Sequence, residues 1–357
     1  MGTQEKRILA VSLVRATLVL GCVTATVAQS LVVFDAPNAL ATYVTGMNNR
    51  GDIVGYFRDT SLGNPQHGFL RDKTGEFTVF DAPNALYTYV ARINNRGDIL
   101  GYFGDTSLGN PQHGFVRDNT GAFTVFDAPY SNVQDINDGG DIPGNFYDAT
   151  QAKSRSFLRD RNGTIEAFDA PNASFIFSSS MNNSGDVTGF FEDAQGQMHG
   201  FVRSRNGMFN TFDIPNAKGV LGRAIDERGD AAGTFDENVV FGPPENGFVR
   251  DKNGNITIFD LKGVARYVYT NSINNRGDVA GFLCGSVNGH VGSFGFVRDV
   301  RGDLTIFDLP NVLVTACEEV VVAGSSINDA GEIAGTFGER QPSGIRPKWR
   351  GFLRFLQ

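Results

Sequence analysis

The stretch Tyr89–Asp127, which reads YVARINNRGDILGYFGDTSLGNPQHGFVRDNTGAFTVFD, contains three short motifs that recur along the chain. They are Ile-Asn-x-x-Gly-Asp, Gly-Phe-Val-Arg and Phe-Asp. Each lies in or beside a short run rich in β-branched and aromatic residues, which is typical of a strand. Gly97 and Gly121 end two of the breaks between these runs, where glycine supplies the positive φ of a tight turn. The stretch therefore predicts four short antiparallel strands.

Versions of the three motifs occur seven times along the chain. Successive Phe-Asp pairs are 42 to 48 residues apart and begin at Phe34, Phe80, Phe126, Phe168, Phe212, Phe259 and Phe307. A fixed period near 45 residues is typical of propellers and solenoids. No copy shows helical periodicity, so we expect an all-β fold: a seven-bladed β-propeller with four antiparallel strands per blade. A solenoid with open ends is the alternative.

The two ends of the repeat array complement each other. The last copy, residues 327–357, stops after Gly-Phe-Leu-Arg and lacks its Phe-Asp strand, whereas Leu31–Asp35 (LVVFD) supplies a spare one. We expect the strand 31–35 to complete the last blade and close the ring, which removes strand edges that invite aggregation. Residues 29–357 then form a single domain in which the Ile-Asn strand of each blade is innermost.

The first 28 residues have the pattern of a secretory signal peptide. Three cations, the last at Arg15, precede the apolar run 16–25, and small residues up to Ala28 offer a cleavage site. We predict a secreted or periplasmic protein cleaved after Ala28. The residues before Cys22 also resemble a lipobox, so a lipid anchor on Cys22 is an alternative. No segment of 29–357 is long and apolar enough to predict a membrane span.

Composition excludes some classes of partner. The formal charge of -8 argues against nucleic acid, whose affinity comes from clustered cations on the protein. The 41% of hydrophobic residues is enough for a large core and argues against disorder. We expect a monomer whose partners are a glycan or an extracellular protein.

The Ile-Asn-x-x-Gly-Asp motifs resemble those of a known family when taken together with three triplets, His67-Gly68-Phe69, His113-Gly114-Phe115 and His199-Gly200-Phe201. This is the HAF family, extracellular repeat proteins named for a His-Ala-Phe triplet. The resemblance covers residues 29–357, although Gly replaces the family's Ala and four copies lack the His. It implies an exported bacterial repeat protein, and it implies no catalytic residue.

Each repeat also contains an acid at the start of its second strand and an arginine at the end of its third. These two positions lie at the same end of adjacent antiparallel strands, so we predict an ion pair within each blade. The seven predicted pairs are Asp52 with Arg71, Asp98 with Arg117, Asp141 with Arg159, Asp186 with Arg203, Asp230 with Arg250, Asp278 with Arg298 and Glu332 with Arg354.

Candidate ligand-binding residues come from the innermost strands. An aromatic residue stands four positions before the Ile or Met of the Asn motif in four copies: Tyr43, Tyr89, Phe177 and Tyr269. The long, variable connections should gather on one face of the ring, which is the natural binding face. We interpret these aromatics as a stacking rim around a central pocket, assisted by Arg92 and Arg223. Packing between blades is the alternative role for them.

Two cysteines, Cys284 and Cys317, follow the predicted signal peptide. Both fall in long connections of neighbouring repeats, so in an oxidising compartment they form a candidate disulfide, with two free thiols as the alternative. The histidines recur in only three equivalent positions, and the Asn motifs mostly supply one carboxylate each. We therefore predict no metal site and no cofactor.

The sequence lacks the local signatures of common catalytic sites, such as Gly-x-Ser-x-Gly and His-Glu-x-x-His. Our leading hypothesis is therefore an exported binding or interaction module, with carbohydrate as a candidate ligand. A polysaccharide hydrolase or lyase is the first alternative, because propeller enzymes assemble carboxylates from separate blades. That enzyme would need two opposed carboxylates or a His-Glu cluster in the central pocket, whereas aromatics and amides there would favour binding. A structural envelope or matrix protein is the second alternative to a binding module.

Overall fold

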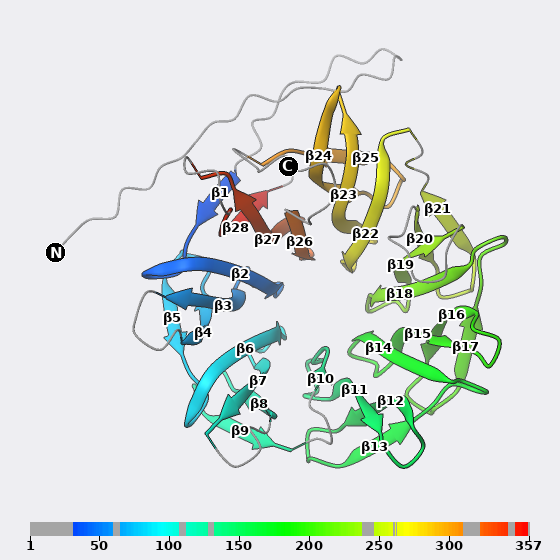
Figure 1. Ribbon diagram of the computed structural model, residues 1–357, viewed down its shortest axis with the longest axis horizontal. Coiled ribbons are helices and arrows are strands. Elements are labelled where there is room, and N and C mark those ends of the chain that lie inside the picture. The colour runs from blue at the N-terminus through cyan, green and yellow to red at the C-terminus, as the bar shows by residue number, and fades with distance from the viewer. Residues whose placement is uncertain are drawn as a thin grey trace.

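The protein is an all-β β-propeller whose sheets surround a central axis (Figure 1). A computed structural model describes residues 31–59, 65–106, 112–127, 132–237, 246–259, 261, 263–309, 322–341 and 347–355. Within these ranges all the regular secondary structure is β-strand. The predicted signal peptide, residues 1–28, lies outside the described residues. No helix in the described ranges is long and apolar enough to cross a membrane.

Three four-stranded antiparallel sheets come first along the chain. The first contains β2 (Ala39–Met47), β3 (Ile53–Asp59), β4 (Gln66–Arg71) and β5 (Phe77–Phe80). The second contains β6 (Ala85–Ile93), β7 (Ile99–Asp105), β8 (Gln112–Arg117) and β9 (Phe123–Phe126). The third contains β10 (Asn132–Val133), β11 (Ile142–Asp148), β12 (Lys153–Arg159) and β13 (Ile165–Phe168). In each sheet the strands pair in chain order, as the repeat predicts.

The next two repeats share one eight-stranded sheet. Its first half contains β14 (Phe175–Met181), β15 (Val187–Glu192), β16 (Met198–Arg203) and β17 (Phe209–Phe212). Its second half contains β18 (Gly219–Ile225), β19 (Ala231–Asp236), β20 (Asn246–Arg250) and β21 (Ile256–Phe259). A single parallel pair, Met198 with Gly219, joins β16 to β18. The described chain thus has six hydrogen-bonded sheets, and the prediction of seven separate four-stranded sheets is wrong at this junction.

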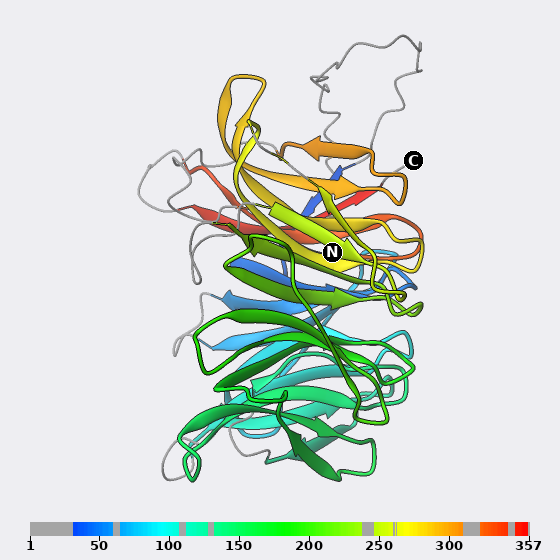
Figure 2. The ribbon, with the colours of Figure 1, turned by 90° about the vertical axis from the view of Figure 1, so that its right-hand side faces the viewer.

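Of the two remaining sheets, the second combines the first and the last described strands of the chain. The first sheet consists of β22 (Ala265–Ile273), β23 (Val279–Val287), β24 (His290–Arg298) and β25 (Leu304–Phe307). The other has the order β1 (Leu31–Phe34), β28 (Lys348–Phe355), β27 (Glu332–Glu339) and β26 (Val322–Ile327). Leu31 pairs with Arg354 and Phe34 with Gly351, so the predicted closure by the N-terminal strand is confirmed. Figure 2 shows the strands crossing the short dimension of the disc.

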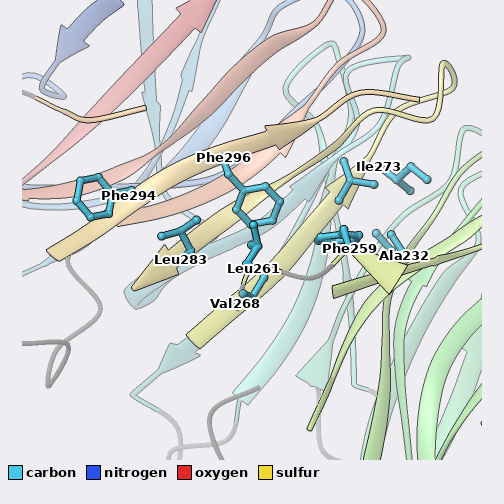
Figure 3. Packing of buried hydrophobic residues seen from close by; sticks show 10 residues of the cluster. Ala232, Phe259, Leu261, Val268, Ile273, Leu283, Phe294 and Phe296 are labelled. Carbon is cyan, nitrogen blue, oxygen red and sulfur yellow. The ribbon is translucent and has the colours of Figure 1, made fainter. Parts of the chain in front are cut away.

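The core lies between neighbouring sheets. In the cluster of Figure 3, Ala224 and Ala232 of β18 and β19 pack against Val268, Leu283 and Phe296 of the next sheet. Alternate residues of each strand point to opposite faces, so every sheet contributes apolar side chains to two such layers. The Gly-Phe motif fits this packing, because the Phe side chain is fully buried while the Gly leaves room for the ring of the Phe-Asp motif.

The repeated arginines do not form the predicted ion pairs. Each one instead stacks on the Phe-Asp ring of the preceding repeat, with the guanidinium carbon 4.1 to 5.5 Å from the ring centre. The seven contacts are Arg71 on Phe34, Arg117 on Phe80, Arg159 on Phe126, Arg203 on Phe168, Arg250 on Phe212, Arg298 on Phe259 and Arg354 on Phe307. They bind neighbouring repeats together through cation–π contacts.

Six of the seven acids bind groups of their own turns, and Asp186 accepts a hydrogen bond from the backbone N–H of Arg205, so the predicted pairing is wrong. Asp52 accepts hydrogen bonds from the Asn48 amide and the Arg50 guanidinium, and Asp98 and Asp278 have equivalent partners. Among the described residues, none of Asp52, Asp98, Asp141, Asp186, Asp230, Asp278 and Glu332 is in an ion pair with its predicted arginine. Adjacent strands bring each acid and arginine to one end of the sheet, but the long arginine side chain reaches across to the Phe-Asp ring of the preceding repeat.

Candidate functional site

The innermost strands surround the central axis (Figure 1). Residues of these strands help to line two cavities. The smaller cavity, about 170 Å³, is lined by residues of the tight turns such as Asn48, Asn94 and Asn137. The larger cavity, about 490 Å³, is lined mainly by residues that come earlier in the innermost strands, together with Tyr56, Thr336 and Trp349 of other strands. Its volume lies within the range of about 300–1,000 Å³ that is typical of small-molecule sites.

A closed ring of hydrogen bonds joins the seven repeats around the smaller cavity. One residue of each repeat donates its backbone N–H to a side-chain oxygen of the next repeat, at 2.6 to 3.0 Å. The members, in order, are Asn49, Asn95, Asp138, Asn183, Glu227, Asn275 and Asp329, which returns to Asn49. All seven are Asn, Asp or Glu, and this recurrence in the sequence is the signal from which the ring could have been predicted.

Five of the six predicted ligand-binding residues line the larger cavity: Tyr43, Tyr89, Arg92, Phe177 and Arg223. The sixth, Tyr269, is not among the lining residues and stacks on Phe282 at 4.6 Å between ring centres. These five positions thus converge on one cavity from four repeats, which belong to three hydrogen-bonded sheets. Their role in binding a ligand stays a prediction.

Aromatic rings form a continuous stack along one side of the larger cavity. Trp349 of β28 contacts Tyr43, which stacks on Tyr56 at 4.9 Å between ring centres. Tyr56 in turn contacts Tyr89 of the next sheet at 4.6 Å, and Tyr89 stacks on Tyr102 at 4.4 Å. The stack therefore forms part of the cavity wall and also packs neighbouring sheets together, which is the alternative role considered for these aromatics.

The second strands supply aromatic residues that were not predicted from the sequence. Tyr56, Tyr102, Phe190 and Phe282 each pair in register with an aromatic residue of the first strand. Where the first strand has no aromatic residue, the partner is Asn145, Thr234 or Thr336. This matched pattern is present in the sequence, since each of these residues directly follows the Gly of its second strand.

The tyrosines of the stack are neutral phenols at physiological pH. Burial raises the pKa of the Tyr102 phenol to about 12 and raises the pKa values of Tyr43, Tyr56 and Tyr89 as well. They can therefore donate or accept hydrogen bonds, and they place no negative charge beside the cavity.

Arg92 and Arg223 contribute positive charge to the larger cavity. Nη1 of Arg92 donates to the backbone oxygens of Thr45 at 2.6 Å and Ala91 at 3.1 Å. The guanidinium carbon of Arg223 lies 5.5 Å from the ring centre of Phe190, and burial lowers the pKa of Arg223. Arginine stays protonated in proteins because its pKa is so high, so both groups are cations.

The repeated histidines lie outside the larger cavity, each held between two acids. The nearest contacts of His199 are Asp213 at 2.7 Å and Asp193 at 3.2 Å. Burial opposes protonation of His199, but the two acids raise its pKa overall. Arg155 takes the same place between Asp148 and Asp169 in another repeat. The described residues include no group of three or more His, Cys, Asp or Glu that could hold a metal ion.

The disulfide prediction concerns one residue that is described and one that is not. Cys284 in β23 is buried and disulfide-bonded. Cys317 lies outside the described residues, so its pairing with Cys284 stays a prediction.

Comparison with solved structures finds similar propellers. The chain is similar to the β-propeller domain of the Trilobed protease from Pyrococcus furiosus, with a TM-score of 0.60, 12% identity and coverage of 88% of this chain and 94% of that one. It is also similar to virginiamycin B lyase from Staphylococcus aureus, with a TM-score of 0.57, 13% identity and coverage of 92% and 100%. Comparisons with protein families and with curated proteins find no match. At these identities the likeness shows the fold alone.

Proposed function

We propose that the protein is an exported binding module that recognises a sugar or another small polar ligand in the larger central cavity. The observation that carries this proposal is the composition of the cavity wall. Its described lining combines aromatic rings and arginines with the amides of Gln134 and Asn271, and it contains no carboxylate and no imidazole. Aromatic faces cover the apolar face of a sugar ring, and amides and guanidinium groups can bind its hydroxyls.

The same composition weighs against the hydrolase and lyase alternative. Glycoside hydrolysis needs two carboxyl groups about 5 to 9.5 Å apart on either side of the scissile bond. The acids of the smaller cavity are engaged in the turns instead: Asp135 accepts hydrogen bonds from Ser180 and Met181, and Asp138 accepts from Asn95 and Asn183. Such acids hold the inner strands together, a structural role that needs no substrate.

We further propose that each of the seven repeats acts as one blade. The single Met198–Gly219 pair that merges two of them leaves the four antiparallel strands of each repeat paired in order. This proposal is supported by the seven-membered hydrogen-bond ring, which receives one residue from every repeat. Membership of the HAF family and cleavage of a signal peptide after Ala28 belong to the same proposal, supported by the sequence motifs.

Thermal shift and product release, measured together on the purified protein with a panel of oligosaccharides, test the proposed function. We expect at least one glycan to raise the melting temperature without release of product. A Tyr89→Ala variant should lose this shift, whereas Tyr147→Ala, which removes an exposed tyrosine outside the cavity, should retain it. Product release would instead support the hydrolase or lyase, and the absence of any shift across the panel would count against glycan binding.

A further inference from the structure

The larger cavity contains two cations that no acid of its described lining neutralises. Arg92 lies in β6 and Arg223 in β18, so they reach the axis from different sheets. Both residues, together with Asn271, also line the smaller cavity, which places them at the boundary between the two cavities. They therefore form part of the floor of the larger cavity.

Other arginines near the axis have a different environment. Arg50, Arg96, Arg228 and Arg276 each bind the acid two residues later in the same turn, at 2.6 to 2.7 Å. The described partners of Arg92 are backbone oxygens, and Arg223 is stacked on a phenylalanine ring. The two floor arginines thus keep guanidinium N–H groups for a ligand, while the turn arginines are already paired.

Among the described residues that line the larger cavity, none carries an anion that would compete for the two arginines. Asp135 lines only the smaller cavity, and its two carboxylate oxygens accept hydrogen bonds from Ile136, Ser180 and Met181. Arg92 lies beside the Tyr89 phenol and Arg223 beside the Tyr269 phenol, close enough for each guanidinium to favour the phenolate. Burial outweighs this effect at both tyrosines and raises their pKa values, so both phenols stay neutral.

We propose that the ligand is an acidic sugar whose carboxylate binds Arg92 and Arg223 while its ring lies against the aromatic stack. This inference rests on the proposed function and narrows it to uronate-type saccharides. A guanidinium group presents planar, paired N–H donors that match the two oxygens of a carboxylate. Both arginines are half-buried, and a charge-assisted hydrogen bond is stronger in partly desolvated surroundings than in open water.

The test compares ligands that differ at one functional group. We would measure binding of a uronic acid oligosaccharide, of the neutral oligosaccharide with a hydroxymethyl group in place of each carboxylate, and of a simple carboxylic acid without a sugar ring. Isothermal titration calorimetry on the intact protein gives each dissociation constant. We expect the acidic sugar to bind about ten-fold or more tightly than the neutral one, because hydrogen bonds between ionised groups are about twice as strong as neutral ones.

Variants then assign the preference to the two arginines. Arg223→Gln and Arg92→Gln should each weaken binding of the acidic sugar more than binding of the neutral sugar, and so reduce the preference for the acidic one. Arg266→Gln, which removes an exposed arginine stacked on Tyr267 outside the cavity, is the matched control and should change neither affinity. Arg223→Lys retains the charge, so it should preserve part of the preference even if Arg223→Gln fails to fold.

The possible outcomes separate this inference from the proposed function. Equal affinity for the acidic and neutral sugars would overturn the inference and leave the sugar-binding proposal standing. Equal affinity for the simple carboxylic acid and the acidic sugar would show that the ring is not recognised, which overturns the acidic sugar as the ligand. Failure of both sugars to bind would overturn the two proposals together.

Discussion

Substitution of Arg117 tests whether the repeated arginine is held by an aromatic ring or by an acid. Its guanidinium carbon lies 4.8 Å from the ring centre of Phe80, whereas Asp98 accepts hydrogen bonds from Asn94 and Arg96. Phe80 is buried, and Nε of Arg117 is buried without a hydrogen-bond partner, so the contact is partly shielded from water. Cation–π contacts contribute about 0.5 kcal/mol when exposed and about 2 kcal/mol when desolvated, so we expect about 1 kcal/mol here.

Two double-mutant cycles measure this coupling through the free energy of unfolding in urea. The first combines Arg117→Met with Phe80→Leu, and the second combines Arg117→Met with Asp98→Asn. We expect a coupling of about 1 kcal/mol in the first cycle and less than about 0.5 kcal/mol in the second, as for residues without a shared contact. A larger coupling with Asp98 than with Phe80 would refute our account of the arginine and restore the ion pair within the repeat.

Two further predictions concern packing and pH. At Gly68 an added Cβ would lie 2.6 Å from the Phe80 ring, so Gly68→Ala should destabilise the fold by about 1–3 kcal/mol. Gly46→Ala is the control, because its Cβ would meet its nearest atoms at 3.6 Å; similar melting temperatures for both variants would contradict the packing argument. Burial opposes protonation of His199, but the acids around it raise its pKa above 6.5. The stabilisation that His199 contributes should therefore be greatest below pH 6.5, and it should be lost as the pH rises through the pKa of His199 in the folded state. A His199→Asn variant should lose this part of the pH dependence of urea unfolding; an unchanged profile would show that His199 does not cause it.

Much of the fold could be read from the sequence because it depends on local patterns that repeat. Gly97 and Gly121 have φ near +93° and +96°, as their predicted turns require. The complementary ends predicted the pairing of β1 with β28. The merging of two repeats through Met198 and Gly219 could not be predicted, since it depends on how closely two neighbouring sheets approach, and no local signal encodes that distance.

The candidate site was only partly predictable. Tyr43, Tyr89 and Phe177 could be chosen because the position on the inner strand recurs in each repeat. Tyr56 was missed because its stacking depends on cross-strand register, which the pattern of a single strand does not reveal. Trp349 was missed for a different reason: it is the only tryptophan, so no repeat points to it, and it meets Tyr43 only after the ring has closed.

The sequence by itself determined the strands, the turns, the order of pairing within each repeat and the closure of the ring, because turn chemistry and strand alternation act over a few residues. Tertiary structure alone decided which groups meet across repeats. It placed Arg117 on Phe80 where the sequence suggested Asp98, and it brought Tyr56 of one sheet into contact with Tyr89 of the next. Such contacts depend on the distance and tilt between sheets, which are set by the packing of the whole ring.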